Sequence, residues 1–497
     1  MDTIQLWGFL SLLMVVASAV VITPKAPQSG KVDFSSPSKK PWKAWTPHKF
    51  RDQHGDVCPD MDPLILTPMI RNGDIAEAQE QARVHLPGTN VTSYSGYLTV
   101  NQSDSSQMFF WFFQAEVAEP ENAPVVVWLQ GGPGATSMFG LFDEHGPFYV
   151  TDDLRLIPRD YRWTLLANML YIDNPVGTGW SFTKSDDGYA RNQDQVGKNL
   201  YEALLQFYEL FPRYQKSSDL YITGESYGGK YVPALGYTVH MNNQKSKLKL
   251  PFKGVAIGNG WVDPENMLDY GDLLYNIGMA DDKERDYINA KNVLVKKAIQ
   301  EERYLDAFEI EDPVMDGDRF PYPTYFFNIS GSRYYYNFLQ STEPAGFSNY
   351  LRYLNQCHVR SAIHVGNQVF DGGLKVEKYL LEDIYKTAKH YLVPLMENYK
   401  VMLYNGQLDI ICALPLTENF LSKLEWKRAE EYKKANKFVW KVQKDDVEAA
   451  GYVRMVGSSP PFYQVGVRAG GHMLPYDQPR FSFDLIYRFL NERSFRD

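Results

Sequence analysis

The sequence predicts an α/β fold, in which a mostly parallel central sheet carries helices on both faces. Short apolar segments that are typical of buried strands recur along the chain, at residues 125–129, 169–172, 220–223 and 255–257. A helical hydrophobic pattern at residues 195–211 lies between two of them. Strands that alternate with helices in this way form a parallel sheet covered on both sides.

The strand pattern stops after Trp261, and charged helical stretches such as residues 281–310 take its place. This change predicts a largely helical cap insertion at residues 261–390. The insertion divides the predicted core into a first part at residues 61–260 and a second part at residues 391–497.

The N-terminal residues predict export. The apolar run at residues 6–22 contains small residues up to Ala19, which predicts a signal peptide at residues 1–19. Asp2 precedes the run, with no lysine or arginine, so an uncleaved anchor is the alternative. The run is shorter than the roughly 20 residues of a membrane span, and we expect no stable membrane insertion. Residues 20–60, rich in proline, lysine and serine, predict a flexible leader or propeptide.

Three sequons predict N-linked glycosylation, at Asn90, Asn101 and Asn328. Together with the signal peptide they place the protein in the secretory pathway, either secreted or lysosomal. The chain has three cysteines, Cys58, Cys357 and Cys412, so at most one internal disulfide forms and one thiol is left over.

The net charge and the motifs of the sequence argue against several classes of function. The net charge of −9 and the isoelectric point near 5.6 argue against a nucleic-acid partner. No metal-ligand spacing and no dinucleotide fingerprint is evident in the sequence. We therefore expect neither a metal ion nor a cofactor, and we leave open whether the protein forms a homodimer.

Ser226 is the candidate nucleophile. It lies between Gly224 and Gly228, directly after a short β-prone run, which is the setting of a strand-to-helix nucleophile elbow. Glycine is needed at both positions because a Cβ atom would crowd the strained backbone. The five-residue pattern alone also fits an ordinary turn, so partners elsewhere in the chain have to support it.

The C-terminal part supplies an acid and a base in the order that such an elbow requires. A buried strand ends near Asn405-Gly406, which predicts a chain reversal and leaves Asp409 on a loop at the edge of the sheet. A second short strand is followed by two glycines and His472, the candidate general base. For Asp409 alone, a turn-capping role is the alternative.

A glycine-rich turn follows the strand at residues 125–129 and ends at Gly134. Such a turn can direct backbone N–H groups toward a developing oxyanion. In hydrolases with this elbow, one donor follows the nucleophile and the other lies on a loop after an earlier strand. We therefore assign the oxyanion hole to the amides of Gly132 and Tyr227.

Taken together, these motifs resemble the serine carboxypeptidases, a family of α/β-hydrolases that remove single residues from peptide C-termini. The resemblance extends from about Pro63 to Leu490, and within the family it is closest to the vitellogenic-like carboxypeptidases of animals. The family resemblance rests on segments in the family's order: residues 128–134, 144–147, 173–182, 224–234, 405–409 and 470–472. The closer likeness within the family rests on residues 128–134, 363–368 and 472–479.

The resemblance implies that Ser226, Asp409 and His472 form a catalytic triad. It also implies that Trp128, Gln130, Glu144 and Glu225 bind the substrate's terminal carboxylate. Two glutamates suit that task when crowding and desolvation raise a carboxyl pKa, because a protonated carboxyl donates a hydrogen bond. This implies that peptides bind tightest at acidic pH.

Two positions depart from the family's pattern. Gln130 stands where the family usually has asparagine, and its amide reaches one methylene further. Ala135 stands where a disulfide cysteine is common, so that bridge cannot form. Some family members carry a free cysteine at the position of Cys412, which implies a thiol beside the substrate site; a small buried hydrophobic residue is the alternative.

The function predicted from the sequence is a serine-type carboxypeptidase that acts on peptide or protein C-termini through an acyl-enzyme. An acyltransferase on the same scaffold is an alternative, as is a protective or binding protein with incidental hydrolase activity. The aromatic run Tyr334–Tyr336 lies in the predicted cap, where we expect it to pack rather than to line substrate.

Overall fold

The computed structural model describes residue 58 and residues 60–317 and 323–496. The predicted signal peptide and most of the predicted leader lie outside these residues. Within the part that the structure describes, no helix is both long and apolar enough to cross a membrane.

An eleven-stranded sheet runs through the described chain, in the order β1-β2-β3-β7-β4-β8-β9-β10-β13-β12-β11. Neighbours from β7 to β13 are parallel, and the strands on either side of this central part are antiparallel. The strands are β1 Arg83–Val84, β2 Ser93–Asn101, β3 Ser106–Phe113, β4 Val125–Leu129, β7 Asn168–Ile172, β8 Leu220–Glu225, β9 Phe252–Gly258, β10 Lys400–Gly406, β11 Phe438–Trp440, β12 Gly451–Val456 and β13 Phe462–Val467. A separate antiparallel pair consists of β5 Phe148–Val150 and β6 Leu156–Pro158.

The central strands are apolar on both faces because two cores enclose the sheet. In β4, Val125 and Val127 belong to one core, whereas Val126 and Trp128 belong to the other. Successive strand residues point to opposite faces, so a strand covered on both sides reads as a continuous apolar run. This explains why the strands could be recognised from the sequence.

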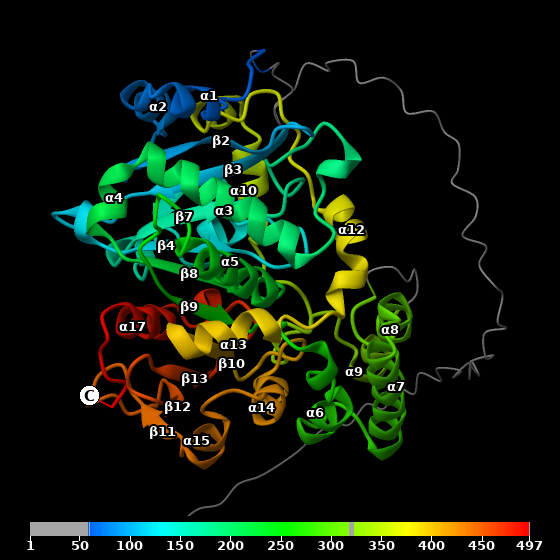
Figure 1. Cartoon of the computed structure of the whole chain (residues 1–497). Coiled ribbons are helices and arrows are strands. Elements are labelled where there is room, and N and C mark those ends of the chain that lie inside the picture. Colours follow the sequence, from blue (N-terminus) through cyan, green and yellow to red (C-terminus); the bar gives the residue numbers. More distant parts are fainter. Residues whose placement is uncertain (1–57, 59, 318–322, 497) are drawn as a thin grey trace, which may run out of the picture. The chain divides into compact units, whose positions relative to one another are not determined.

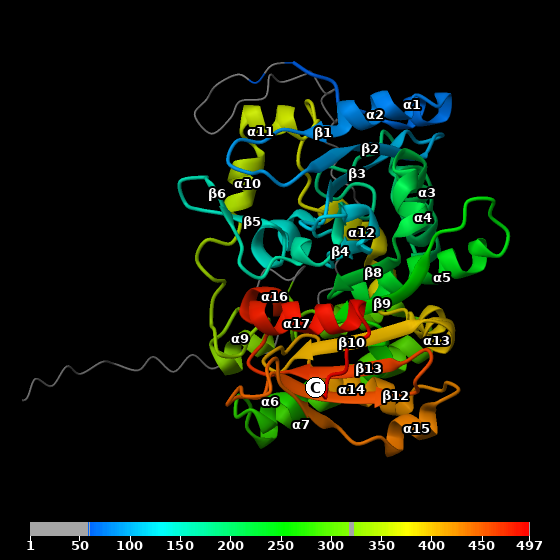
Figure 2. The same ribbon diagram turned by 90° about the vertical axis from the view of Figure 1, so that its left-hand side faces the viewer.

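Helices cover both faces of the sheet (Figures 1 and 2). The first core includes apolar residues of α3 Gln193–Leu210, α5 Gly228–Asn243 and α13 Lys389–Asn398. The second core includes residues of α16 Leu474–Asp477 and α17 Pro479–Leu490. The predicted α/β-hydrolase architecture, with a mostly parallel sheet between helical layers, is confirmed.

Only helices are described between β9 and β10, apart from one isolated bridge at Asp371. They are η5 Pro264–Asn266, α6 Tyr270–Asn276, α7 Asp282–Gln300, α8 Tyr304–Glu311, α9 Tyr325–Ser330, α10 Asn349–Leu354, α11 Cys357–Ala362, α12 Leu374–Ile384 and α13. Asp281 and Glu284 form a capping box at the start of α7. This helical region falls where the sequence predicts the cap insertion, whose domain boundaries stay a prediction.

The remaining helical segments connect these layers. They are α1 Thr67–Asn72, α2 Ile75–Ala82, α4 Pro212–Ser217, α14 Leu414–Lys423, α15 Ala429–Lys434, the 3₁₀ turns η1 Pro120–Asn122, η3 Trp163–Leu165 and η4 Asp186–Gly188, and the π-helical turn η2 Gly140–Glu144.

One disulfide joins Cys58 to Cys357, at the start of α11, across a sequence separation of 299 residues. Cys412 is the remaining thiol and is buried. Two of the three cysteines thus form a disulfide and the third is a free thiol. The sequence alone left open whether Cys58 and Cys357 pair.

Replacement of Gly224 by alanine is expected to destabilise the fold. A Cβ atom there would lie 2.5 Å from the carbonyl oxygen of Leu129 and 2.9 Å from Cγ2 of Val232. Overpacking of this kind costs about 1–3 kcal/mol, so thermal unfolding should show a midpoint several degrees lower. Gly372→Ala is the matched control, because no heavy atom lies within 4 Å of the added Cβ. Equal midpoints for the two variants would contradict this account.

Candidate active site

Ser226 occupies the sharp turn between β8 and α5, with a left-handed backbone at φ +62°. Its N–H donates to the carbonyl of Gly258 at 3.1 Å, and its own carbonyl accepts from the N–H of Trp261 at 2.9 Å. A Cβ atom at Gly224 or Gly228 would lie 2.5 Å or 2.7 Å from the Leu129 carbonyl oxygen. The elbow therefore requires both glycines for the reason that the sequence suggested.

Asp409 and His472 are in direct contact. Nδ1 of His472 lies 2.9 Å from Oδ2 of Asp409, and both side chains are buried. The same carboxylate oxygen accepts from Nδ2 of Asn259 at 2.7 Å. Nε2 of His472 makes no hydrogen bond within the described residues. Asp409 therefore orients the ring and leaves the far nitrogen available to act as a base.

One local prediction about this region is wrong. Asn405 and Gly406 do not form a chain reversal; they belong to β10 and pair with Gly466 and Val467 of β13. The side-chain amide of Asn405 donates to the carbonyl of Cys412, which ties the following loop to the strand. Because this hydrogen bond occupies the side chain of Asn405, that side chain does not promote a turn. The chain reverses after β10 instead.

Two cavities flank Ser226. The first, of about 370 Å³, is lined by His472, Gln130 and Glu225 among others. The second, of about 280 Å³, is lined by Tyr227 and Cys412 among others. Ser226 lines both, and so does Gly132. Gly132 and Tyr227, the residues of the predicted oxyanion amides, thus both line the second cavity together with Ser226.

The aromatic run of the predicted cap lines these cavities. Tyr334 lies on the first, Tyr335 on the second and Tyr336 on both. The ring of Tyr336 is 4.8 Å from that of His472, between centroids. The expected packing within the cap is present, since the rings of Tyr335 and Phe326 are 6.5 Å apart between centroids. The run also lines both cavities beside Ser226, so the alternative, that it lines the substrate site, stays open.

A chain of buried hydrogen bonds joins three of the four predicted carboxylate-binding residues, Trp128, Gln130 and Glu225. Nε1 of Trp128 donates to Oε1 of Gln130 at 2.8 Å, and Nε2 of Gln130 donates to Oε1 of Glu225 at 3.0 Å. The longer side chain of Gln130 thus keeps its amide in the cluster. Glu144, at the end of η2, is also fully buried.

The two glutamates favour the protonated form. Burial raises the pKa of Glu144 to about 8. Burial raises the pKa of Glu225 well above its ordinary value, and the charge of Glu144 raises it further. Two neighbouring buried carboxyl groups favour a protonated form, because burial disfavours each charge and the two charges would repel each other. The pair can therefore donate a hydrogen bond at neutral pH.

Several residues of this site were not identified from the sequence. Asn259 follows β9, and its side chain contacts both Asp409 and the N–H of Gly406. Phe139, Phe347 and Phe370 line the first cavity. No motif marked them, although Asn259 lies two residues after the predicted strand at residues 255–257, where polar residues reach the functional edge of a parallel sheet.

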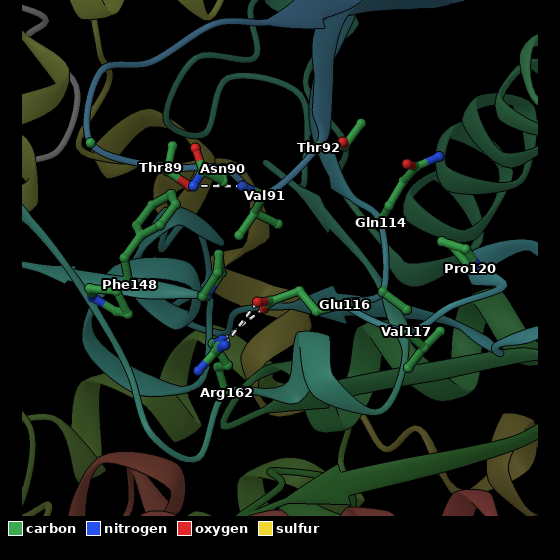
Figure 3. Close-up of a pocket in the computed structure, with 14 residues that line it drawn as sticks. Thr89, Asn90, Val91, Thr92, Gln114, Glu116, Val117, Pro120, Phe148 and Arg162 are labelled. Carbon is green, nitrogen blue, oxygen red and sulfur yellow. Dashed lines mark hydrogen bonds and ion pairs between the residues drawn. The ribbon is translucent and has the colours of Figure 1, made fainter.

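The predicted glycosylation sites differ in accessibility. Asn90 and Asn328 are exposed, whereas Asn101 is half-buried and its side-chain amide donates to Asp104. Asn90 lies at a separate cavity of about 420 Å³, in which Arg162 faces Glu116 (Figure 3). None of the other predicted site residues lines that cavity. Modification of these asparagines stays a prediction.

The residues around Ser226 are of the kinds that acyl transfer requires. Within residues 60–317 and 323–496, no group of three or more His, Cys, Asp or Glu side chains is placed to hold one. Ser226 and Gly132 line both cavities, His472 lines the first and Tyr227 the second. A hydroxyl, an imidazole and backbone amides are the groups that serine hydrolases use.

Residues 85–492 match the family model described as serine carboxypeptidase. The chain belongs to the serine carboxypeptidase family. It is a serine-type carboxypeptidase, a hydrolase that acts on peptides. The resemblance inferred from the sequence is thus confirmed.

Relatives support this assignment over most of the chain. The probable serine carboxypeptidase CPVL of Homo sapiens is 51% identical over 430 residues, 86% of this chain and 89% of that protein. The venom serine carboxypeptidase of Apis mellifera is 48% identical, covering 87% of this chain and 92% of that protein. The vitellogenic carboxypeptidase of Aedes aegypti is 41% identical, covering 90% and 95%.

The fold is shared with a solved structure, a prohormone-processing carboxypeptidase from Saccharomyces cerevisiae. The TM-score is 0.68 at 22% sequence identity, over 83% of this chain and 96% of that one. At this level of identity the match supports the fold alone.

Bulky thiol reagents are expected to inhibit the enzyme through Cys412. This thiol lines the cavity beside Ser226, so a bulky adduct would fill space next to the nucleophile. Burial raises the pKa of Cys412 well above its ordinary value, so inhibition should be slow. The measurement is residual peptidase activity over time, for wild type and Cys412→Ser. Equal inhibition of both proteins would show that the loss of activity does not come from Cys412.

Proposed function

We propose that Ser226, Asp409 and His472 are the catalytic triad of this carboxypeptidase. The contact between Asp409 and His472 carries the proposal, because it leaves Nε2 as the proton acceptor in the cavity that Ser226 also lines. An aspartate in this position holds the imidazole in the correct tautomer and stabilises the imidazolium that forms. The side-chain amide of Asn259 donates to the same carboxylate oxygen.

The proposed reaction has two half-reactions. His472 accepts the hydroxyl proton of Ser226 while the serine oxygen attacks the carbonyl carbon of the last peptide bond. The imidazolium then gives that proton to the leaving amine, so the C-terminal amino acid departs and an acyl-enzyme remains. In the second half, His472 takes a proton from water, the hydroxide attacks the ester, and Ser226 recovers its proton.

The amides of Gly132 and Tyr227 are proposed to bind the oxyanion of each tetrahedral intermediate. The lining of the two cavities supports this proposal, because Ser226 and Gly132 line both cavities and Tyr227 lines the second. A donor of this kind contributes roughly 10²- to 10³-fold to the rate.

Trp128, Gln130, Glu144 and Glu225 are proposed to recognise the terminal carboxylate of the substrate. The hydrogen-bond chain from Trp128 through Gln130 to Glu225 supports this role, as does the opening of Gln130 and Glu225 into the first cavity. A proton held by the glutamate pair converts a repulsive contact into a donated hydrogen bond. Its loss at higher pH removes the donor and adds a charge.

The protein is proposed to work in the secretory pathway, as a secreted or lysosomal enzyme. A disulfide between Cys58 and Cys357 suits an oxidising compartment, and two of the three sequons are exposed. The relative from Apis mellifera is called a venom enzyme. Cleavage of a signal peptide after Ala19 stays a prediction.

Ser226→Ala is expected to lower peptidase activity by at least about 10³-fold, because it removes only the hydroxyl that forms the acyl-enzyme. The measurement is hydrolysis of blocked dipeptides by protein free of other peptidases. The unfolding midpoint should stay within a few degrees of wild type. A fully active Ser226→Ala enzyme would refute the assignment of the nucleophile.

Peptide binding is expected to depend on the proton of the glutamate pair. The raised pKa values keep that proton through the acidic and neutral range. The Michaelis constant should therefore be flat at low pH and rise by about tenfold per pH unit above pH 8. The pH range in which the Michaelis constant rises is therefore more alkaline than the sequence alone predicted.

Glu225→Gln is the decisive variant, because an amide donates a hydrogen bond without a titrating proton. Its Michaelis constant should rise less steeply above pH 8. Substrates whose C-terminus is blocked as an amide serve as the control and should show little rise with either enzyme. An identical pH profile for wild type and Glu225→Gln would contradict the proposed proton.

A further inference from the structure

Helix α12 contacts both loops that carry the proposed oxyanion amides. Its residues come from the region between β9 and β10, and none of them belongs to the predicted catalytic set. Its N-cap residue, Gly373, lines the second cavity beside Ser226, and so does Ile384 at its last position. Both ends of the helix thus line this cavity.

The C-terminal end of α12 is bonded to the elbow through Asp383. Oδ2 of this buried carboxylate accepts from the phenol of Tyr227 at 2.6 Å and lies 3.1 Å from Nζ of Lys230. It also accepts from Nε2 of Gln193 at 2.7 Å. Burial opposes the charge, yet Lys230 and the hydrogen bonds outweigh it and lower the pKa of Asp383. The carboxylate is therefore a fixed acceptor for Tyr227.

A second hydrogen bond joins the C-terminal end of α12 to the elbow. Nε1 of Trp261 donates to the carbonyl of Ile384 at 2.8 Å, while the N–H of Trp261 donates to the carbonyl of Ser226 at 2.9 Å. One tryptophan therefore bonds both the last turn of α12 and the nucleophile's own peptide group.

The N-terminal end of α12 packs against the glycine turn. A Cβ atom at Gly134 would lie 2.8 Å from the carbonyl oxygen of Gly373 and 3.1 Å from Cβ of Val376. Conversely, a Cβ atom at Gly373 would overlap the carbonyl group of Gly134. The turn that carries the Gly132 amide is thus in backbone contact with the first turn of the helix.

We infer that α12 sets the relative position of the two oxyanion amides, and that Asp383 is a positioning residue that acts through the phenol of Tyr227. The inference rests on the proposed function, because it assumes that the amides of Gly132 and Tyr227 bind the oxyanion. Tyr227 follows the nucleophile directly, so a fixed side chain restrains rotation of the peptide group that carries the donor. Lys230, one turn along α5, keeps Asp383 ionised.

The test removes only the phenol hydroxyl, with Tyr227→Phe. The turnover number per active site should fall about tenfold, less than for a deleted donor because the amide is displaced rather than lost. The Michaelis constant should stay within about twofold. Affinity for a peptide boronic acid, which forms a tetrahedral adduct with a serine nucleophile, should fall by the same factor as the turnover number.

Tyr208→Phe is the matched control, since this buried tyrosine of α3 makes no side-chain hydroxyl hydrogen bond within the described residues. It should leave turnover and boronate affinity unchanged. A purely structural role for Tyr227 would lower the unfolding midpoint and the number of active sites, but not the turnover per site. Unchanged turnover and boronate affinity in Tyr227→Phe would overturn the inference.

A second comparison tests Asp383 without leaving a buried unpaired ammonium group. Lys230→Met is combined with Asp383→Asn, which keeps an acceptor oxygen, or with Asp383→Leu, which has none. The variant with Asp383→Asn should turn over about tenfold faster per active site than the variant with Asp383→Leu, again because only the position of the oxyanion donor differs. Equal turnover would overturn the role of Asp383. If Ser226→Ala retained full activity, the proposed function itself would fail; if only these variants behaved like wild type, the positioning role alone would fail.

Discussion

The left-handed backbone at Ser226 is the constraint on which the site depends. A residue other than glycine in this conformation is strained by about 1–3 kcal/mol, and it persists only where its surroundings determine it. Here the surroundings are the hydrogen bonds to Gly258 and Trp261, together with the close approach of the Leu129 carbonyl to Gly224 and Gly228. The tight packing of β4 against β8 thus holds the serine at the edge of the sheet.

Desolvation determines the chemistry on either side of this serine. At Glu144 and Glu225 burial outweighs the charge of Arg159, which lowers the pKa of Glu144 only in part, so the pair favours a shared proton. At Asp383 the nearby Lys230 reverses the outcome, and the carboxylate stays ionised. The same physical effect therefore yields a hydrogen-bond donor in one cluster and a fixed acceptor in the other.

The sequence predicted those features that local chemistry determines. The doubly buried strands appear as apolar runs, and the glycines around Ser226 and before His472 mark turns that admit no side chain. Long-range contacts left no such signal: Asn259 reaches Asp409 across 150 residues, as an asparagine in an unremarkable loop. The turn predicted at Asn405 is wrong because two contacts override the turn propensity of this residue: its pairing in the sheet and the hydrogen bond of its side-chain amide.

The disulfide between Cys58 and Cys357 bears on how the chain would respond to proteolysis. Ser226 lies within the loop that the bridge closes, whereas Asp409 and His472 lie beyond it. A single cut at any bond between the two cysteines would therefore yield two polypeptides that stay covalently linked, with the nucleophile able to remain beside its base. Such a nicked enzyme would keep its full mass under oxidising conditions and would separate into two chains only on reduction.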